Sequence, residues 1–159
     1  MVRPGFLWVL YNTNYALKYY ELLDTLMLAL RNKPTPALHV YHHAATLLLC
    51  YVSIAERLAV QWVPISINLF VHVVMYSYYG LQGMGCRVWW KQCVTVLQIA
   101  QFVVDLVAVY YASALRITRG PDACEGTLLG AFVGMGILTS YLVLFVGFYR
   151  RTYAKPKAA

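Results

Sequence analysis

The stretch LLGAFVGMGILTSYLVLFVGFY, residues 128–149, runs for 22 residues without a single charged side chain. A helix needs about 20 mostly apolar residues to cross the hydrocarbon core of a bilayer. The stretch therefore predicts a transmembrane helix. Four further candidate spans lie upstream, at about residues 6–30, 37–55, 62–81 and 92–112, and the first of these is the most polar.

The composition indicates the same class of protein. Of the 159 residues, 61% are hydrophobic and 12% are charged, whereas soluble domains carry about 25% charged residues. We therefore predict an all-α integral membrane protein with about five transmembrane helices, forming a single membrane domain over residues 1–159. We ascribe the net charge of +7 to basic residues that set the orientation of the protein in the membrane. No nucleic-acid partner is expected.

The basic residues divide unequally between the two sides of the membrane. Five spans place the two termini on opposite sides, and cytosolic segments of membrane proteins carry more Lys and Arg than the others. The larger number accompanies the C-terminus, which we therefore expect in the cytosol. Its side has Arg31, Lys33, Arg87, Lys91, Arg150, Arg151, Lys155 and Lys157, against Arg3, Arg57, Arg116 and Arg119 on the other side.

The last five residues, KPKAA, place two lysines near the C-terminus of a basic tail at 150–159. This pattern resembles the di-lysine retrieval signal of endoplasmic-reticulum membrane proteins, which works only in the cytosol. The alternative is a solvated tail that binds anionic lipid. We favour the retrieval signal and predict a multi-pass protein of the endoplasmic reticulum.

Polar side chains recur at helical spacing inside the candidate spans. Ionisable groups are costly in a bilayer, so they are functional candidates by default. HVYHH (39–43) places His39, His42 and His43 at positions i, i+3 and i+4, on one helix face. The other spans contribute Lys18, Glu21 and Asp24; Asn68, His72, Met75, Tyr76 and Tyr79; and Thr95, Gln98, Gln101 and Asp105.

One interpretation of HxxHH is a metal site, as in membrane di-iron oxidases. Two metals in a membrane site consume many imidazoles, and this chain has four histidines in total. A single zinc could take His39, His43 and His72. The second and third spans contain no carboxylate to orient those rings, so we favour a site without metal.

The other interpretation uses an imidazole directly. A ring removed from water favours its neutral, nucleophilic form. Attack on an acyl thioester would give an acyl-imidazole, which is an activated acyl group. Hydrogen bonds to the oxyanion or enolate could then come from Asn68, Tyr76, Tyr79 and Gln98.

Four motifs occur in one order along the chain: KYYELLDT (18–25), HVYHH (39–43), HVVMYSYY (72–79) and TVLQIAQ (95–101). They match the patterns KxxExxDT, HxxHH, HxxMYxYY and TxxQxxQ. In this the chain resembles the ELO-type very-long-chain fatty acid elongases from about Tyr11 through Tyr111. NLFVHVVMYSYY (68–79) and CRVWWKQCVTVLQIAQFVVDL (86–106) look most like fungal members.

The resemblance implies an acyltransferase of the endoplasmic reticulum with seven helices, of which this chain has the last five. Its reaction would condense long-chain acyl-CoA with malonyl-CoA to 3-ketoacyl-CoA, CO₂ and CoA, supplying very-long-chain fatty acids and sphingolipid precursors. No metal or other cofactor is implied. By position, His42 would accept the acyl group and His72 would be its acid–base partner. His39 and His43 would orient the site, Gln98 and Gln101 would line it, and Lys18, Glu21 and Asp24 would be its ion-paired support.

Four basic residues would bind the phosphates of CoA at the mouth of the site: Arg31, Lys33, Arg87 and Lys91. Pro34, where polyunsaturated-type members often carry Gln, favours saturated or monounsaturated chains. The implied partners are membrane lipid, the ketoacyl reductase, dehydratase and enoyl reductase of the cycle, and, left open, a second copy in a homodimer. Two other functions stay open: a histidine-box metal enzyme, and a non-catalytic shortened partner of full-length elongases.

Overall fold

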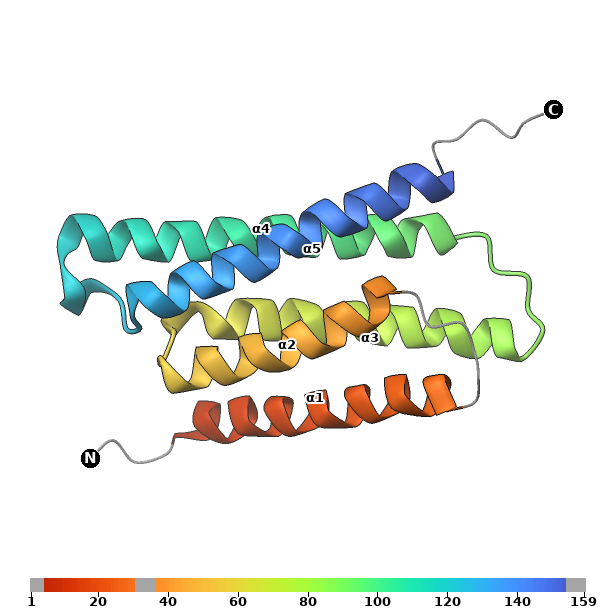
Figure 1. Ribbon diagram of the computed structural model, residues 1–159, viewed down its shortest axis with the longest axis horizontal. Helices are drawn as coiled ribbons and strands as arrows, with labels where there is room; N and C mark the ends of the chain where they lie inside the picture. The colour runs from red at the N-terminus through yellow and green to blue at the C-terminus, as the bar shows by residue number, and fades with distance from the viewer. Residues whose placement is uncertain (1–4, 31–36, 154–159) are drawn as a thin grey trace.

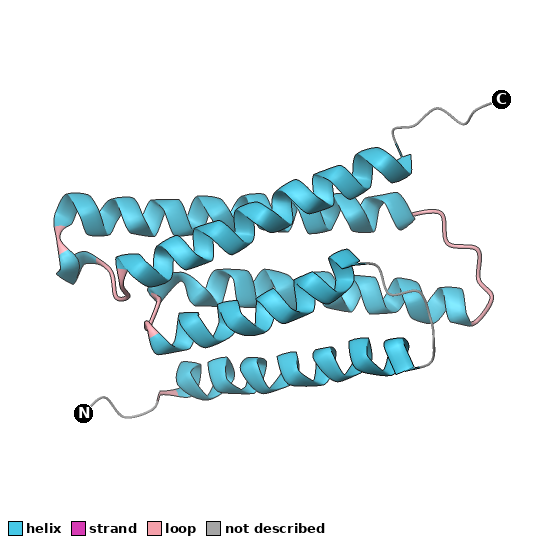
Figure 2. Ribbon diagram, in the orientation of Figure 1, coloured by secondary structure: helices cyan, strands magenta, loops and turns pink. Residues whose placement is uncertain are grey.

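The structure, a computed structural model, describes residues 5–30 and 37–153, which form five long helices joined by short connections (Figures 1 and 2). Two short 3-10 helices, η1 (Ala59–Gln61) and η2 (Pro121–Ala123), precede α3 and α5. The predicted all-helical class is confirmed. The long helices are α1 (Phe6–Leu30), α2 (Ala37–Ala55), α3 (Trp62–Gly83), α4 (Lys91–Arg119) and α5 (Leu128–Tyr153).

Three helices are longer than the apolar stretches that predicted them. α3 continues to Gly83 rather than ending at 81, and α4 covers 91–119 rather than 92–112. α5 runs to Tyr153, so its last residues lie in what we expected to be a tail at 150–159. An apolar stretch reflects the thickness of the hydrocarbon layer, whereas a helix ends where its backbone is interrupted.

The end of α4 shows this difference. Gly120 has φ = 93°, a left-handed backbone conformation that glycine adopts without steric cost. Pro121 follows and cannot continue a helix. Residues 113–119 contain neither Gly nor Pro, so the helix continues through them past the last apolar turn.

The helices form a bundle in which α4 packs on α5 and α3, and α2 packs on α5 and α1. Figure 1 shows α1 along one side and the α4–α5 pair along the other, with α2 and α3 between them. Many large apolar side chains on the outer faces are exposed, as expected for contact with lipid. The buried core lies between α4 and α5 and consists of Phe102, Leu106, Val109, Ala131, Leu138, Tyr141 and Phe145.

Four helical segments of the described residues are long and apolar enough to cross a membrane: α2, residues 59–83, α4 and α5. α1 has 25 residues, but polar side chains such as Asn12, Asn14 and Lys18 lower its hydropathy. The membrane character is therefore borne out for four helices, and a fifth span at α1 stays a prediction.

The two ends of the bundle differ in charge. At one end α3 and α5 finish and α4 begins. We call this the basic end, because it carries Arg87, Lys91, Arg150 and Arg151. At the other end α2 is joined to α3 and α4 to α5. We call this the mixed-charge end, because it carries Glu56, Arg57, Arg116, Arg119, Asp122 and Glu125.

Two hydrogen bonds connect the loops of the mixed-charge end. The Thr127 hydroxyl donates to the Glu56 carboxylate, and the backbone N–H of Ala59 donates to the carbonyl of Glu125 at 3.1 Å. The α2–α3 connection and the α4–α5 connection are thus tied to each other, although about 70 residues separate them in the chain.

Candidate active site

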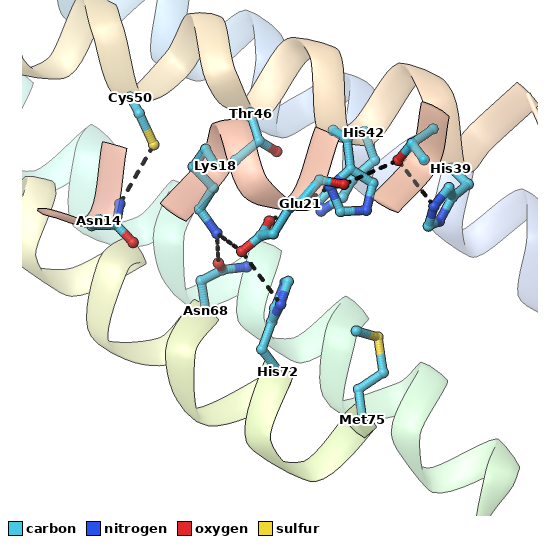
Figure 3. A network of polar contacts seen from close by, with 12 residues as sticks. Asn14, Lys18, Glu21, His39, His42, Thr46, Cys50, Asn68, His72 and Met75 are labelled. Atoms are coloured by element: carbon cyan, nitrogen blue, oxygen red, sulfur yellow. Dashed lines mark hydrogen bonds and ion pairs between the residues drawn. The ribbon is translucent and has the colours of Figure 1, made fainter. Parts of the chain in front are cut away.

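Glu21 on α1 stands at the centre of a polar network that joins three helices (Figure 3). Its Oε1 accepts a hydrogen bond of 2.7 Å from Lys18 Nζ and lies 3.7 Å from His72 Nδ1 on α3. Its Oε2 lies 3.5 Å from His43 Nδ1 on α2. Lys18 Nζ also donates a hydrogen bond of 2.7 Å to Asn68 Oδ1 on α3. One carboxylate therefore connects two of the histidines with the lysine.

This network is shielded from solvent. Lys18 is 3% exposed and the Glu21 side chain 13% exposed. A buried charge is tolerated only with a close partner of opposite sign, and the spacing i, i+3 places these two side chains together on one helix face. The ion pair expected between Lys18 and Glu21 is present. The side chain of Asp24, its expected alternative partner, lies outside what the structure describes.

The three histidines of HVYHH contact two different parts of the bundle. His39 Nε2 lies 3.3 Å from the Thr25 hydroxyl on α1, and His43 contacts Glu21 on the same helix. The His42 ring instead packs against aromatic side chains of α4 and α5. The motif was expected to present one common face. The His42 ring points away from the other two because successive residues of a helix are rotated by about 100°. α1 lies on the side of His39 and His43, and α4 and α5 lie on the side of His42.

His42 sits in a cage of aromatic rings. Its ring centroid lies 4.7 Å from that of Tyr141, 5.7 Å from Phe145 and 6.1 Å from Phe102. The ring of His43 lies 5.4 Å away on the other side. The Nδ1 atom of His42 is buried and makes no hydrogen bond to a described residue. The cage holds the ring in place without occupying that nitrogen.

Tyr141 also fixes the backbone beneath this ring. Its hydroxyl donates a hydrogen bond of 3.0 Å to the main-chain carbonyl of His42 and lies 2.9 Å from the Thr46 hydroxyl. Because a tyrosine hydroxyl has one proton, Thr46 is the donor in the second bond. Tyr141 is 1% exposed, so both bonds are protected from water.

A cavity of about 50 Å³ begins beside this cage and is lined by side chains from all five long helices. His42, Phe102 and Tyr141 line one part of it, together with Lys18 and Asn68 of the network. The cavity continues towards the mixed-charge end, as far as Gln61 at the start of α3. His42 and Lys18, the lysine of the ion pair, thus border the same cavity.

The remaining predicted residues of α3 and α4 lie at different distances from this space. Gln101 is buried and lines the cavity. Gln98 donates a hydrogen bond of 3.6 Å to Met75 Sδ and is not among the lining residues. Tyr76 packs on His72 with ring centroids 5.7 Å apart, but Tyr76 and Tyr79 are 50% and 54% exposed. Neither tyrosine borders the cavity.

The predicted CoA-binding residues are only partly described. Arg87 and Lys91 are exposed at the basic end, in and just after the connection between α3 and α4. Arg31, Lys33, Pro34 and the KPKAA sequence lie outside the described residues.

The sequence did not single out the aromatic cage. Tyr141, Phe102 and Phe145 belong to apolar stretches in which aromatic residues are ordinary. The one available signal was Tyr141, because a tyrosine in the middle of a buried apolar helix needs a hydrogen-bond partner. Its partners come from α2, about 95 residues earlier, and nothing in the local sequence identifies them.

A metal was the alternative for the histidines. Among residues 5–30 and 37–153, no three His, Cys, Asp or Glu side chains are arranged to hold a metal ion. What the described groups offer is a caged imidazole beside a cavity, with a carboxylate that supports two further imidazoles. This arrangement suits acyl transfer through a ring nitrogen and proton transfer at the neighbouring rings.

Comparison with known proteins supplies the family. The sequence profile of the GNS1/SUR4 family, also called ELO, matches residues 3–159. "Putative fatty acid elongase 1" of Schizosaccharomyces pombe is 49% identical over 156 residues, which cover 94% of this chain and 47% of that protein. The expected likeness to fungal members is confirmed.

Two more distant relatives have similar names. "Fatty acid elongase A" of Dictyostelium discoideum is 37% identical over 160 residues, covering 99% of this chain and 59% of that protein. "Very long chain fatty acid elongase 5" of Mus musculus is 34% identical over 158 residues, covering 91% of this chain and 48% of that protein. No solved structure matches the chain.

The chain spans about half the length of the curated relatives it matches. The family profile nevertheless covers nearly all of its own residues, including the four motifs that build the network and the cavity wall. The chain therefore belongs to the GNS1/SUR4 (ELO) family, and the relatives quoted above are named fatty acid elongases.

Proposed function

We propose that this chain carries the condensing centre of a fatty acid elongase, a very-long-chain 3-oxoacyl-CoA synthase. The observation that supports this most directly is the position of His42. Its ring is held by three aromatic side chains, its buried Nδ1 makes no hydrogen bond to a described residue, and it borders the cavity. A ring with these properties is available as a nucleophile.

In the proposed reaction a ring nitrogen of His42 attacks the thioester carbonyl of long-chain acyl-CoA. The carbon–sulfur bond breaks, and CoA leaves as a thiol after taking up a proton. Malonyl-CoA then loses CO₂, and the electron pair of the broken bond forms an enolate at its C2. This carbon attacks the acyl-imidazole, the bond between the acyl carbon and the ring nitrogen breaks, and 3-ketoacyl-CoA forms. The ring that leaves takes up a proton, delivered by way of His72, and becomes neutral histidine again.

The neighbouring groups have separate proposed roles. His72 transfers protons, and Glu21 holds both His72 and His43 from the opposite side. His39 helps to orient α2 against α1 through Thr25. Lys18 balances the Glu21 charge, and Asn68 holds the lysine. These contacts position the rings, so their loss would reduce the rate without removing the nucleophile.

The surroundings complete the proposal. The acyl chain enters beside His42, and Arg87 and Lys91 attract the phosphates of CoA at the basic end. That end faces the cytosol of an endoplasmic-reticulum membrane, and the reaction needs no metal or other cofactor. The 3-ketoacyl product requires a ketoacyl reductase, a dehydratase and an enoyl reductase to complete one cycle. A homodimer is a further proposal that the assay below does not depend on.

The decisive experiment traps the acyl group on the protein. Membranes from cells without elongases of their own, carrying the chain, receive labelled long-chain acyl-CoA in the absence of malonyl-CoA. We expect a covalent label on the wild-type chain and on His39→Ala, released by hydroxylamine, and none on His42→Ala. Adding malonyl-CoA should convert the label into 3-ketoacyl-CoA.

Two controls make the result interpretable. Each variant must be present in the membrane in equal amount and unfold at a similar temperature in detergent. The assay is repeated with a version extended by the segments of the S. pombe relative that this chain does not cover. A label that persists in His42→Ala in both versions contradicts the assignment of the nucleophile. Condensation without any covalent label contradicts the acyl-imidazole step.

A further inference from the structure

The cavity has a polar part that the proposed chemistry leaves unused. Six buried side-chain atoms among the described residues lack a hydrogen-bond partner, and five of these atoms belong to residues that line this one cavity. One is the Nδ1 of His42. The other four are oxygens: Asn14 Oδ1 on α1, Gln61 Oε1 in η1, and both carboxylate oxygens of Asp105 on α4.

Asp105 is the most completely buried of these residues. It is 0% exposed, and it lies near the middle of a helix that can cross the membrane. Burying a carboxyl group without a hydrogen bond carries a large free-energy cost. The amide of its neighbour Gln101, one turn earlier, is close enough to interact with this carboxyl group, although no hydrogen bond of normal geometry joins them, and Gln101 also lines the cavity. Such a group persists in an apolar helix when something in the adjacent space satisfies it.

The unpaired atoms set the chemistry of the missing partner. The amide nitrogen of Asn14 already donates to Cys50 Sγ at 3.6 Å, which leaves its oxygen as the free group. The unpaired oxygens, which accept hydrogen bonds, thus belong to three residues from three elements that line one space: Asn14, Gln61 and Asp105. An occupant must therefore bring a hydrogen-bond donor. Lys18 lines the same cavity, and its positive charge opposes a metal cation there.

The size and the walls of the cavity further limit which chemical group could occupy it. A volume of about 50 Å³ has room for a few groups of the size of a water molecule. Leu49, Ile65 and Leu138 line it beside the polar atoms. This mixture of an apolar wall and a few oriented acceptors suits a hydroxyl group on a hydrocarbon chain.

We propose that the part of the cavity bordered by Asp105, Gln61 and Asn14 is a subsite for a hydroxyl donor, carried by the acyl chain or supplied by a trapped water. This inference rests on the proposed function, because it requires the acyl chain to enter beside His42. Asp105 lies three residues beyond Phe102, a member of the His42 cage, or about 4.5 Å along α4. A chain hydroxyl would therefore sit a few carbons beyond the thioester.

The test uses thioether analogues of acyl-CoA, which bind but cannot transfer their chain. A set of equal length, with one hydroxyl moved along the chain, competes with a labelled unsubstituted analogue for the chain in detergent. If the occupant is a chain hydroxyl, one position binds about tenfold more tightly than the unsubstituted analogue. Asp105→Leu abolishes that preference and Asp105→Asn weakens it. Ser113→Ala, a buried polar residue of α4 outside this cavity, leaves it unchanged.

A trapped water gives a different pattern. No hydroxyl position is preferred, but Asp105→Leu and Gln61→Leu bind the unsubstituted analogue several-fold more tightly, because the chain no longer competes with the water. The subsite is overturned if wild type, Asp105→Asn and Gln61→Leu bind every analogue alike. Turnover of ordinary acyl-CoA is measured in parallel. A hydroxyl preference or a variant effect on binding without turnover rejects the proposed function alone. Turnover with no difference among the analogues and none among the variants rejects the subsite alone.

Discussion

The hydroxyl of Tyr141 on α5 donates a hydrogen bond of 3.0 Å to the main-chain carbonyl of His42 on α2. This carbonyl belongs to the first turns of α2, so its normal acceptor role is to the N–H one turn further on. The additional bond links the backbone of the proposed nucleophile to α5. It holds Tyr141, a member of the aromatic cage, against the backbone that carries the His42 ring.

Tyr141→Phe should lower stability and slow acyl transfer. The variant keeps the ring but loses the bonds to His42 and Thr46, which we expect to cost about 1–3 kcal/mol because both are buried. Thermal unfolding in detergent and the covalent labelling assay measure the two effects. Tyr41→Phe is the matched control, because its hydroxyl bonds to Ser140 at an exposed position. Equal behaviour of the two variants would show that the His42 bond has no special role.

The buried ion pair should behave as a unit. Lys18→Met or Glu21→Gln alone leaves a buried charge without its partner, at an expected cost of about 3–5 kcal/mol. The double variant should lose less than the sum of the two, since no isolated charge remains. Unfolding midpoints of the four proteins complete the cycle. Additive losses would mean that the two charges do not depend on each other.

Two glycines of α5 should respond in opposite directions to alanine. A Cβ on Gly130 would lie 2.8 Å from Glu56 Cβ, whereas a Cβ on Gly136 would have no neighbour within 4 Å. Gly130→Ala should therefore destabilise the contact between α5 and the end of α2 by about 1–3 kcal/mol. Gly136→Ala should stabilise its helix by about 0.5–1 kcal/mol. Unfolding midpoints that shift in the same direction would contradict this packing.

The charges of the basic end should affect substrate capture rather than chemistry. Removing Arg87 and Lys91 as Arg87→Gln and Lys91→Gln should raise KM for malonyl-CoA up to about fivefold per charge, with kcat unchanged. The effect should shrink as salt is added. Arg119→Gln removes one charge at the mixed-charge end and is the control. An equal rise in KM for Arg119→Gln would indicate a general effect of net charge.

Chelation should leave the reaction intact. Because the described residues bring no three metal-ligating side chains together, we expect product formation to continue after treatment with a strong chelator. The measurement compares initial rates before and after chelation and again after zinc or ferrous iron is added. A rate that falls on chelation and returns with one metal would favour the metal-dependent alternative.

The apolar stretches predicted the helical class well, because a membrane imposes a length and a polarity that the sequence records directly. The Lys18–Glu21 contact was also predictable, since both residues lie on one helix three positions apart. The ends of α4 and α5 were harder to predict, because those helices continue beyond the apolar part into charged turns.

The site itself was predicted by residue type and only partly by position. His42 and His43 are adjacent in sequence, yet His42 meets Phe102 and Tyr141 while His43 meets Glu21. Which neighbour each ring meets depends on how α2 sits between α1 and the α4–α5 pair. The same is true of Asp105, which indicates a polar subsite only because packing places it at one cavity with Gln61 and Asn14. Such relations arise from tertiary packing and have no local signature.

The two hydrogen bonds at the mixed-charge end have a mechanical consequence. They fasten the α2–α3 connection to the α4–α5 connection, whereas the backbone between Gly83 and Lys91 joins α3 to α4 at the basic end. Helices α1–α3 and the α4–α5 hairpin are therefore held together at both ends of the bundle, by the chain itself where Arg87 and Lys91 lie and by hydrogen bonds at the opposite end.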